Sequence, residues 1–348
     1  MSNLRERDGK LRENWYIVCL ESELKAKPIQ RMIYDKKVVI FRGNKGIAVL
    51  DDTCLHRKAT LSKGRVEKGQ LICPYHSWTY NTDGEVAHVP SEGENQNIGA
   101  RCLKSYAVHL KDGAVWIWMG DEKASDTSKI WNFPHYAERG WSHYFMVTDF
   151  DNEVTNLVEN FVDVPHTVSV HKGWFRNKSL QKVPFNTATS NGEVLVTYDS
   201  PDDNIGVLMR PLLNPKNESM LHTDKFIYPN ITRVDYSFGQ NYKYVINSEC
   251  TPVSTMRSRV YTYIAYKIPV IGSFFKPLIQ YYTRQVINQD VWIMKVQSEN
   301  LDTVNGNTFQ STPADEPHIH IERLRRQGVT TPAKVYEVEM NSDHTMWI

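Results

Sequence analysis

Two pairs of cysteine and histidine stand close together in the first quarter of the sequence. Cys54-x-His56 is followed, after sixteen residues, by Cys73-x2-His76. Thiolate and imidazole side chains at such short spacings can bind a single metal centre. Two kinds of centre remain open from the residue types alone. One is a closed tetrahedral zinc site, and the other is a [2Fe-2S] cluster with two thiolates on one iron and two imidazoles on the other.

A second set of polar residues follows further along the chain, in the order Asn160-x2-Asp163-x2-His166-x4-His171. Asp163 and His166 are three residues apart, so they share one face of a helix. His166 and His171, five apart, would point about 140° apart on an ideal helix. Both can reach one metal only if the helix ends or bends between them. Pro165 is a reason for such a disturbance, because it removes a backbone donor.

The residues around the first two pairs resemble the two ligand loops of Rieske domains. His56-Arg57 and Cys73-Pro-Tyr-His76 are followed by Trp78-Thr-Tyr80 and Asp83-Gly84 on a β-rich background. Ser77 stands where the family usually has a glycine after the second histidine, a change that removes no ligand. The resemblance therefore favours the [2Fe-2S] cluster over zinc.

Together, the two sets resemble the oxygenase component of Rieske non-haem iron oxygenases. The resemblance runs from about Trp15 to the segment Arg323-Leu-Arg-Arg326, and the order and spacing of the motifs agree. It implies that all four residues of the first set are cluster ligands. The compact chain is most similar to the α3 monooxygenase and demethylase branch, rather than to the α3β3 aromatic dioxygenases.

For the second set, the resemblance implies a mononuclear non-haem Fe(II) held by two histidines and a carboxylate, a triad that leaves coordination positions open. His166 and His171 would be the histidines. Asp290 is the expected carboxylate, because the segment Asn288-Gln-Asp-Val-Trp-Ile-Met-Lys-Val-Gln297 resembles the family segment that contains the ligand aspartate. The next candidates are Glu299 and Glu159.

Asp163 is expected to act as a bridge rather than as a ligand. In the family, the residue at this place hydrogen-bonds a ligand histidine of its own subunit and the second cluster histidine of the neighbouring subunit. By resemblance, Asp163 would connect His166 to His76 of the next chain, which implies a head-to-tail homotrimer. Such contacts fix imidazole orientation and tune the metal. Asn160, one turn earlier, is expected either close to the iron or hydrogen-bonded nearby.

The implied reaction is the O2-dependent oxidation of a small organic substrate by hydroxylation, demethylation or a related C–H oxidation. A monooxygenase is expected rather than a cis-dihydroxylating dioxygenase, and desaturation or oxidative cyclisation is the alternative. Electrons would come from NAD(P)H through a separate flavin reductase or ferredoxin, because the sequence has no G-x-G-x-x-G or flavin motif. Two functions of another class stay open: a pure electron-transfer Rieske protein and a zinc-stabilised binding module.

The elements that position the first set are short strands. Runs of β-branched and aromatic residues separated by turn signals are typical of a small all-β domain. The clearest runs are 15–19, 37–41, 46–50, 70–73 and 114–118. The polar stretch 120–132 is the expected boundary, so we expect a Rieske domain at 1–123 and a catalytic domain at 124–348.

The second region combines helix and strand patterns. Apolar spacing predicts helices over 152–166 and 281–301, and β-rich runs predict strands over 193–198, 224–238 and 257–267. Helices together with an antiparallel sheet make this an α+β catalytic domain.

Composition narrows the partners and the location. Lys and Arg number 41 against 40 Asp and Glu, so no overall charge favours nucleic acid. The most apolar stretch, 261–282, is interrupted by lysine, proline and glycine, which argues against a membrane span. Five cysteines are too few for a disulfide scaffold, and the N-terminal residues lack an apolar signal segment. The sequence therefore predicts a cytoplasmic protein.

Overall fold

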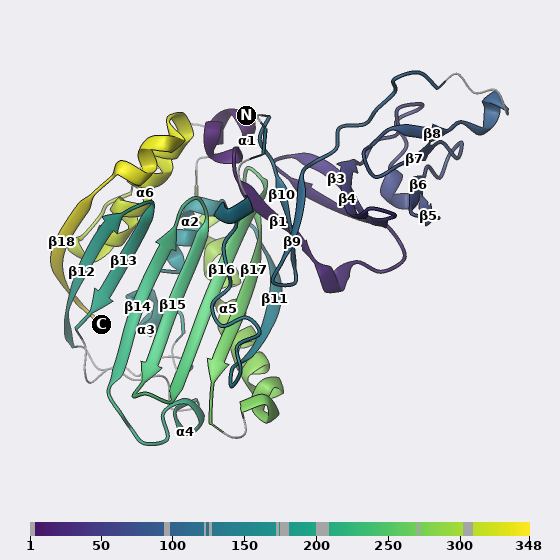
Figure 1. The fold of residues 1–348 in the computed structure, drawn as a ribbon. Coiled ribbons are helices and arrows are strands. Elements are labelled where there is room, and N and C mark those ends of the chain that lie inside the picture. The colour runs from purple at the N-terminus through teal and green to yellow at the C-terminus, as the bar shows by residue number, and fades with distance from the viewer. Residues whose placement is uncertain are drawn as a thin grey trace. The chain divides into compact units, whose positions relative to one another are not determined.

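The structure is a computed structural model that describes residues 4–93, 98–121, 123–124, 127–171, 174, 181–199, 209–269, 272–301 and 309–348. The chain forms two compact units, residues 12–132 and residues 1–11 together with 133–348. Figure 1 shows the elements of both units. Each unit is described by itself below.

The unit of residues 12–132 is built from three small antiparallel sheets. The first has the order β1-β10-β9, the second β2-β3-β4 and the third β5-β6-β7-β8. Their bounds are β1 Trp15–Leu20, β2 Ile29–Ile33, β3 Lys36–Gly43, β4 Gly46–Asp51, β5 Arg65–Glu67, β6 Gln70–Ile72, β7 Thr79–Tyr80, β8 Val86–His88, β9 Val108–Lys111 and β10 Ala114–Trp118. All five predicted strands are confirmed, and this unit is all-β apart from short helical turns.

The larger unit is built around one antiparallel sheet of eight strands, in the order β11-β17-β16-β15-β14-β13-β12-β18. The strands are β11 Ser142–Phe150, β12 Lys182–Ser190, β13 Glu193–Tyr198, β14 Met220–Ile227, β15 Ile231–Phe238, β16 Tyr242–Ser254, β17 Arg257–Lys267 and β18 Met340–Trp347. From β12 to β17, each strand lies beside the next strand in the chain, and β11 and β18 are the two edge strands. The α+β expectation for this region is confirmed.

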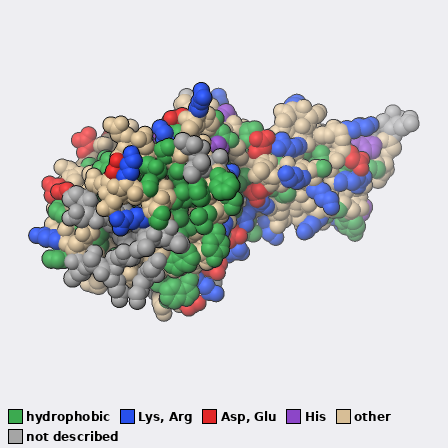
Figure 2. Space-filling view, turned by 90° about the horizontal axis from the view of Figure 1, so that it is seen from below, with side chains coloured by type: hydrophobic (Ala, Val, Ile, Leu, Met, Phe, Trp, Pro, Cys, Tyr) green, Lys and Arg blue, Asp and Glu red, His purple; other side chains and the backbone are tan. Residues whose placement is uncertain are grey.

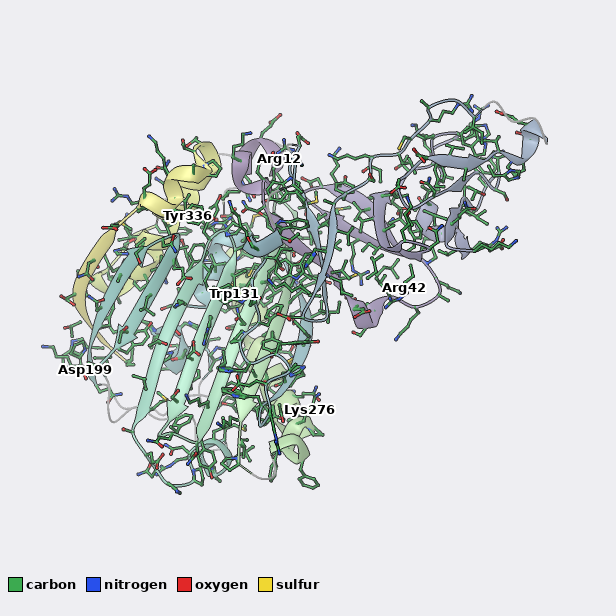
Figure 3. The ribbon with its side chains drawn as sticks, viewed as in Figure 1. Arg12, Arg42, Trp131, Asp199, Lys276 and Tyr336 are labelled. Carbon is green, nitrogen blue, oxygen red and sulfur yellow. The ribbon has the colours of Figure 1, made fainter. Side chains whose placement is uncertain are left out.

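The helices of this unit are α1 Leu4–Asp8, α2 Val154–Asn160, α3 His166–Ser169, α4 Arg210–Leu213, α5 Lys276–Ser298 and α6 Glu316–Thr330. Of these, α2, α4, α5 and α6 contact strands of the sheet. The Thr283 hydroxyl on α5 hydrogen-bonds Tyr144 of β11 at 3.0 Å and Tyr244 of β16 at 2.8 Å. Figure 1 shows α2, α3 and α5 behind the strands in that view. Lys276, at the start of α5, and Tyr336, just after α6, mark opposite ends of this unit (Figure 3).

Two predicted elements of this unit are wrong in their boundaries. The single helix expected over 152–166 is two short helices, because α2 ends at Asn160 and α3 begins at His166. The single strand expected over 224–238 is the hairpin of β14 and β15, which turns at Tyr228-Pro229. Proline has no N–H to donate to a ladder, so the predicted strand does not continue through Pro229.

The outer side of α5 is apolar near its start. Phe274, Leu278 and Tyr281 are exposed, and Figure 2 shows hydrophobic side chains gathered on the face of this unit that it views. Because apolar side chains lie on both sides of this part of the helix, the spacing of apolar residues does not identify the face that packs on the sheet. Among the described helices, none has the length and apolarity needed to cross a bilayer.

Candidate functional site

The loops after β4 and β6 hold the four residues of the first set. Cys54 N–H donates to Ala59 O at 2.9 Å and Cys73 N–H donates to Trp78 O at 2.9 Å, so each loop is closed at its cysteine. Ser77 has φ 55°, in the left-handed region. A glycine adopts this conformation without the steric cost that a Cβ brings. This is a physical reason for the glycine that the family usually has at this position.

The two thiols and the two imidazoles lie at different depths. Cys54 and Cys73 are buried, whereas His56 and His76 are exposed, with their ring centroids 4.5 Å apart. Burial raises the pKa of the Cys73 thiol. Tyr80 contacts Cys54 Sγ through its hydroxyl at 3.2 Å. The loops therefore bring the cysteines together inside and the histidines together outside.

This arrangement differs from a single tetrahedral metal site. A zinc ion bound by two cysteines and two histidines would bring all four ligand atoms close together. Within the described residues, His166, His171 and Asp290 are the one group in which three or more possible ligand atoms lie within 4.8 Å of one another. The separation of the two cysteines from the two histidines agrees with a cluster of two irons, in which one iron binds the cysteines and the other binds the histidines.

A rim of aromatic rings and one cation surrounds the outer pair. The Trp78 ring stacks on His56, with centroids 5.1 Å apart and planes 9° apart. The Arg101 guanidinium lies over the Trp78 ring at 5.5 Å from its centroid, a cation–π contact. The imidazole of His56 is thereby packed on one side even though it is exposed.

In the larger unit, the second set and Asp290 converge on one point. His166 Nε2 and His171 Nε2 are 3.2 Å apart. Asp290 Oδ1 lies 3.5 Å from His166 Nε2 and 3.2 Å from His171 Nε2. Asp290 comes from α5 and is 7% exposed, so the carboxylate reaches the histidines from a helix far away in the sequence. Glu299, by contrast, is exposed beyond the end of α5, and Glu159 is outside this group.

The end of the short helix α3, between the two histidines, makes this convergence possible. Residues 161–165 leave the helix, and His166 begins a new helix with Pro165 at its N-cap. His171 lies just beyond Ser169, where α3 ends. On one continuous helix the two imidazoles would diverge, so the end of α3 at Ser169 allows the change of direction that their spacing required.

The charged forms of His166 and Asp290 stabilise each other and shift each other's pKa. Burial alone would disfavour the imidazolium of His166, but Asp163 and Asp290 outweigh it and raise the pKa of His166 to about 10. Burial likewise opposes a charged Asp290, but His166 and His171 lower the pKa of this carboxyl to about 2. Two imidazole nitrogens and one carboxylate oxygen aimed at each other form a donor set that suits a divalent cation, which displaces the proton when it binds.

Three further side chains orient the triad. Gln289 Oε1 lies 2.9 Å from His171 Nδ1, and Asn160 Nδ2 donates to Asp290 Oδ1 at 3.3 Å. Asp163 Oδ2 faces His166 Nδ1 at 3.5 Å. That nitrogen is buried without a hydrogen-bond partner among the described residues. The sequence did not assign Gln289 a contact, because the contact joins residues 118 positions apart.

The triad opens into a cavity between the helices and the sheet, with a volume of about 100 Å³. Its walls are mostly apolar or aromatic, with threonine and serine hydroxyls between them. Of the aromatic residues between Lys225 and Tyr266, Tyr236 and Tyr244 line it. The cavity also contains a buried pair that sequence reasoning left unassigned, His222 and Asp224 of β14.

Comparison with known proteins identifies the first unit. A family model described as the Rieske [2Fe-2S] domain matches residues 14–107. The vanillate O-demethylase oxygenase subunit of Pseudomonas sp. (strain HR199 / DSM 7063) is 31% identical over 188 residues, which are 53% of this chain and 51% of that protein. The dicamba O-demethylase oxygenase component of Stenotrophomonas maltophilia is 29% identical over 208 residues, 60% of this chain and 61% of that one. These matches span about half to three fifths of the length of the two relatives.

Matches that cover more of the chain have lower sequence identity. Aminopyrrolnitrin oxygenase PrnD of Pseudomonas fluorescens is 26% identical over 310 residues, 82% of this chain and 84% of that protein. The crystal structure of dicamba monooxygenase bound to dicamba superposes with a TM-score of 0.81 at 21% identity, covering 93% of this chain and 98% of that one. At that identity the likeness shows the fold. The chain therefore contains a Rieske [2Fe-2S] domain, is similar over about half of its length to relatives named as oxygenase components, and shares the fold of dicamba monooxygenase.

Proposed function

We propose that this chain is the oxygenase component of a multicomponent Rieske non-haem iron oxygenase, which oxidises a small organic substrate with O2. The observation that carries the proposal is the triad of His166, His171 and Asp290 at the end of a largely apolar cavity. A metal site without an adjoining cavity would have no place for a substrate. Vanillate and dicamba O-demethylases are among the relatives, so O-demethylation comes first among the reactions proposed, before hydroxylation, desaturation or oxidative cyclisation.

In this proposal the residues of the second set have separate roles. His166, His171 and Asp290 would hold Fe(II), which supplies the positions at which O2 is activated. Gln289 accepts a hydrogen bond from His171 Nδ1–H, which leaves the lone pair of Nε2 directed at the metal. Asn160 fixes the carboxylate of Asp290 by donating to its Oδ1. The apolar walls keep bulk water away from the site.

The first set would hold the Rieske cluster, with Cys54 and Cys73 on one iron and His56 and His76 on the other. Tyr80 would then donate a hydrogen bond to the thiolate of Cys54, a contact of the kind that sets cluster potentials. Electrons would come from NAD(P)H through a separate flavin reductase or ferredoxin. The division into a cluster domain, 1–123, and a catalytic domain, 124–348, stays part of the proposal, as does a cytoplasmic location.

The proposal includes a homotrimer. Asp163 lines both the substrate cavity and a second cavity, whose lining includes Asn160 and Glu322. Asp163 is therefore accessible from the side away from the substrate, where His76 of a neighbouring subunit would approach. Light scattering after size exclusion should give three times the chain mass of 40.3 kDa. An active monomer would refute this arrangement.

Electron paramagnetic resonance tests the function directly. Anaerobically purified, dithionite-reduced protein should give the rhombic signal of a Rieske cluster, and added nitric oxide should give a high-spin iron-nitrosyl signal. The Rieske signal alone, in protein supplied with Fe(II), would favour a pure electron-transfer protein. Neither signal, together with zinc found by metal analysis, would favour a zinc-stabilised binding module.

A further inference from the structure

A network of three buried hydroxyl groups lies at the wall of the substrate cavity. Tyr144 of β11, Tyr244 of β16 and Thr283 of α5 are 5%, 2% and 4% exposed. The Thr283 hydroxyl oxygen lies 3.0 Å from the Tyr144 hydroxyl and 2.8 Å from the Tyr244 hydroxyl. The network joins the helix that carries Asp290 to two strands of the sheet. It therefore holds polar groups in fixed positions at a largely apolar wall.

The direction of each hydrogen bond follows from a third contact of Thr283. Its hydroxyl donates to the carbonyl oxygen of Ile279, one helical turn earlier, at 2.8 Å. A threonine hydroxyl has one hydrogen to donate and two lone pairs that accept. Because its hydrogen is used on Ile279, Thr283 accepts a hydrogen from each of the two tyrosines. The bonding capacity of Thr283 is thereby filled within the protein.

The same accounting fixes what the tyrosine hydroxyls can offer to a ligand. A tyrosine hydroxyl also has only one hydrogen, and in both tyrosines it is committed to Thr283. Burial raises the pKa of Tyr244 to about 12, so its hydroxyl stays neutral at physiological pH. Toward any further group, the Tyr244 oxygen can therefore act only as a neutral hydrogen-bond acceptor.

Of the two tyrosines in the network, Tyr244 is the one that reaches the cavity. Tyr244 and Thr283 are both among the lining residues, whereas Tyr144 is not. The Tyr244 hydroxyl lies 2.8 Å from the Thr283 oxygen, so the polar end of Tyr244 is at the wall together with its ring. Tyr282 also lines the cavity, but its hydroxyl donates to the carbonyl of Trp174 at 2.6 Å, and Trp174 is not a lining residue.

We propose that Tyr244 determines substrate specificity, because its oxygen accepts a hydrogen bond from a neutral N–H or O–H group of the substrate. The inference rests on the proposed function, since it takes this cavity as the substrate cavity, and it names one chemical feature that the substrate carries. Sites for small molecules use a few polar groups in an apolar wall to fix the orientation of the ligand. A carbonyl, an ether or a carboxylate oxygen placed against Tyr244 would meet only lone pairs and would gain no hydrogen bond.

Aniline and toluene are the probes, because they have similar shapes and only aniline carries N–H donors. Calorimetry on the iron- and cluster-loaded protein, kept anaerobic, gives a dissociation constant for each probe. Tyr244→Phe keeps the ring and removes the acceptor oxygen. Aniline binding should weaken roughly three- to tenfold, the size of one neutral hydrogen bond, while toluene binding should change less than about twofold. Each probe is compared with itself in the two proteins, so the different hydration of the probes cancels.

The matched control is Tyr144→Phe. It removes the other hydrogen bond to the same Thr283 oxygen, at 3.0 Å, from a residue that does not line the cavity. Both probes should bind as they do to the unchanged protein. A loss of aniline binding as large as in Tyr244→Phe would assign the effect to the hydroxyl network rather than to the cavity, and would overturn the proposal.

A second variant changes the direction of the hydrogen bond. Thr283→Val removes the acceptor of the Tyr244 hydrogen, which can then turn toward the cavity. Benzonitrile, which carries an acceptor and no donor, should bind this variant severalfold more tightly than the unchanged protein. Unchanged benzonitrile binding would overturn the assigned hydrogen direction. The variant also tests the proposal if Tyr244→Phe fails to fold.

The outcomes separate this inference from the proposed function. Unchanged aniline binding in Tyr244→Phe, equal losses for aniline and toluene, or no measurable binding of aniline to the unchanged protein would overturn the role of Tyr244. Calorimetry requires neither O2 nor electron transfer. Protein that binds aniline through Tyr244 but lacks the iron-nitrosyl signal would refute the oxygenase proposal while supporting the specificity residue.

Discussion

The third ligand of the mononuclear site offers the sharpest test of the proposed chemistry. Asp290→Ala removes the carboxylate whose Oδ1 lies 3.5 and 3.2 Å from the two histidine nitrogens. Residues that only orient a ligand typically cost 10–100-fold in metal affinity when mutated, so loss of a ligand itself should cost more than about 100-fold. Turnover should fall accordingly, while the Rieske signal persists because its residues belong to the other compact unit.

Two further variants give reference values for the loss of Fe(II) binding. Gln289→Ala removes the 2.9 Å contact to His171 and should weaken Fe(II) binding by roughly 10–100-fold. Glu299→Ala changes an exposed carboxylate near the end of the same helix, which was a candidate ligand from the sequence, and should have no effect. The order of losses is therefore expected to be Asp290, then Gln289, then Glu299.

The assay is iron content per cluster after anaerobic dialysis against a series of Fe(II) concentrations, with the iron-nitrosyl signal and substrate turnover measured on the same samples. Circular dichroism shows whether each variant is folded. Asp290→Ala protein with one tightly held iron and full turnover would refute the assignment of the third ligand. Loss of iron in Glu299→Ala alone would transfer the role to that residue.

Four other substitutions test separate parts of the structure. Ser77→Gly relieves a left-handed conformation at φ 55° and should raise the free energy of unfolding by about 1 kcal/mol in denaturant titrations. Tyr80→Phe removes a hydrogen bond to a cluster thiolate and should lower the cluster potential in a redox titration; an unchanged potential would contradict that contact. Gly328→Ala places a Cβ in steric overlap with the Tyr228 ring and should destabilise the protein by about 1–3 kcal/mol in thermal melts, although alanine has a higher helix propensity than glycine. Burial raises the pKa of Glu159 from 4.5 to about 8, so its ionisation costs stability as the pH rises through that window. Glu159→Gln should therefore stabilise the protein at pH 8 but hardly at pH 4, and equal melting shifts at both would contradict the raised pKa.

Local sequence was sufficient for features that depend on neighbouring residues. The strand predicted over 257–267 coincides with β17, and the five short strands of the first unit are present. In both cases the pattern of β-branched and aromatic residues agrees with the tertiary environment. The expectation that the helix ends or bends between His166 and His171 also came from spacing, because two histidines five residues apart diverge on a regular helix, and α3 ends at Ser169.

The predicted elements are wrong where the backbone changes direction within a segment that was read as one helix or one strand. The predicted helix over 152–166 continued through residues that leave the helix after Asn160, although Leu157, Phe161 and Val164 keep helical spacing. The predicted strand over 224–238 crossed the turn at Tyr228-Pro229. Hydrophobic periodicity indicates which residues are buried, but it does not show where the chain reverses direction while both segments remain buried.

The sequence by itself determined the residue types and their short spacings, and with them the two pairs of cysteine and histidine and the candidate histidines of the second site. Only the tertiary structure decided which distant residues meet them. Asp290 reaches His166 across 124 positions, and Gln289 reaches His171 from the same helix. The fold of the sheet likewise places His222 and Asp224 on the wall of the same cavity, which their sequence positions do not show. Spacing along a chain fixes direction within one helix or strand, whereas contacts between elements arise from burial and packing of the whole unit.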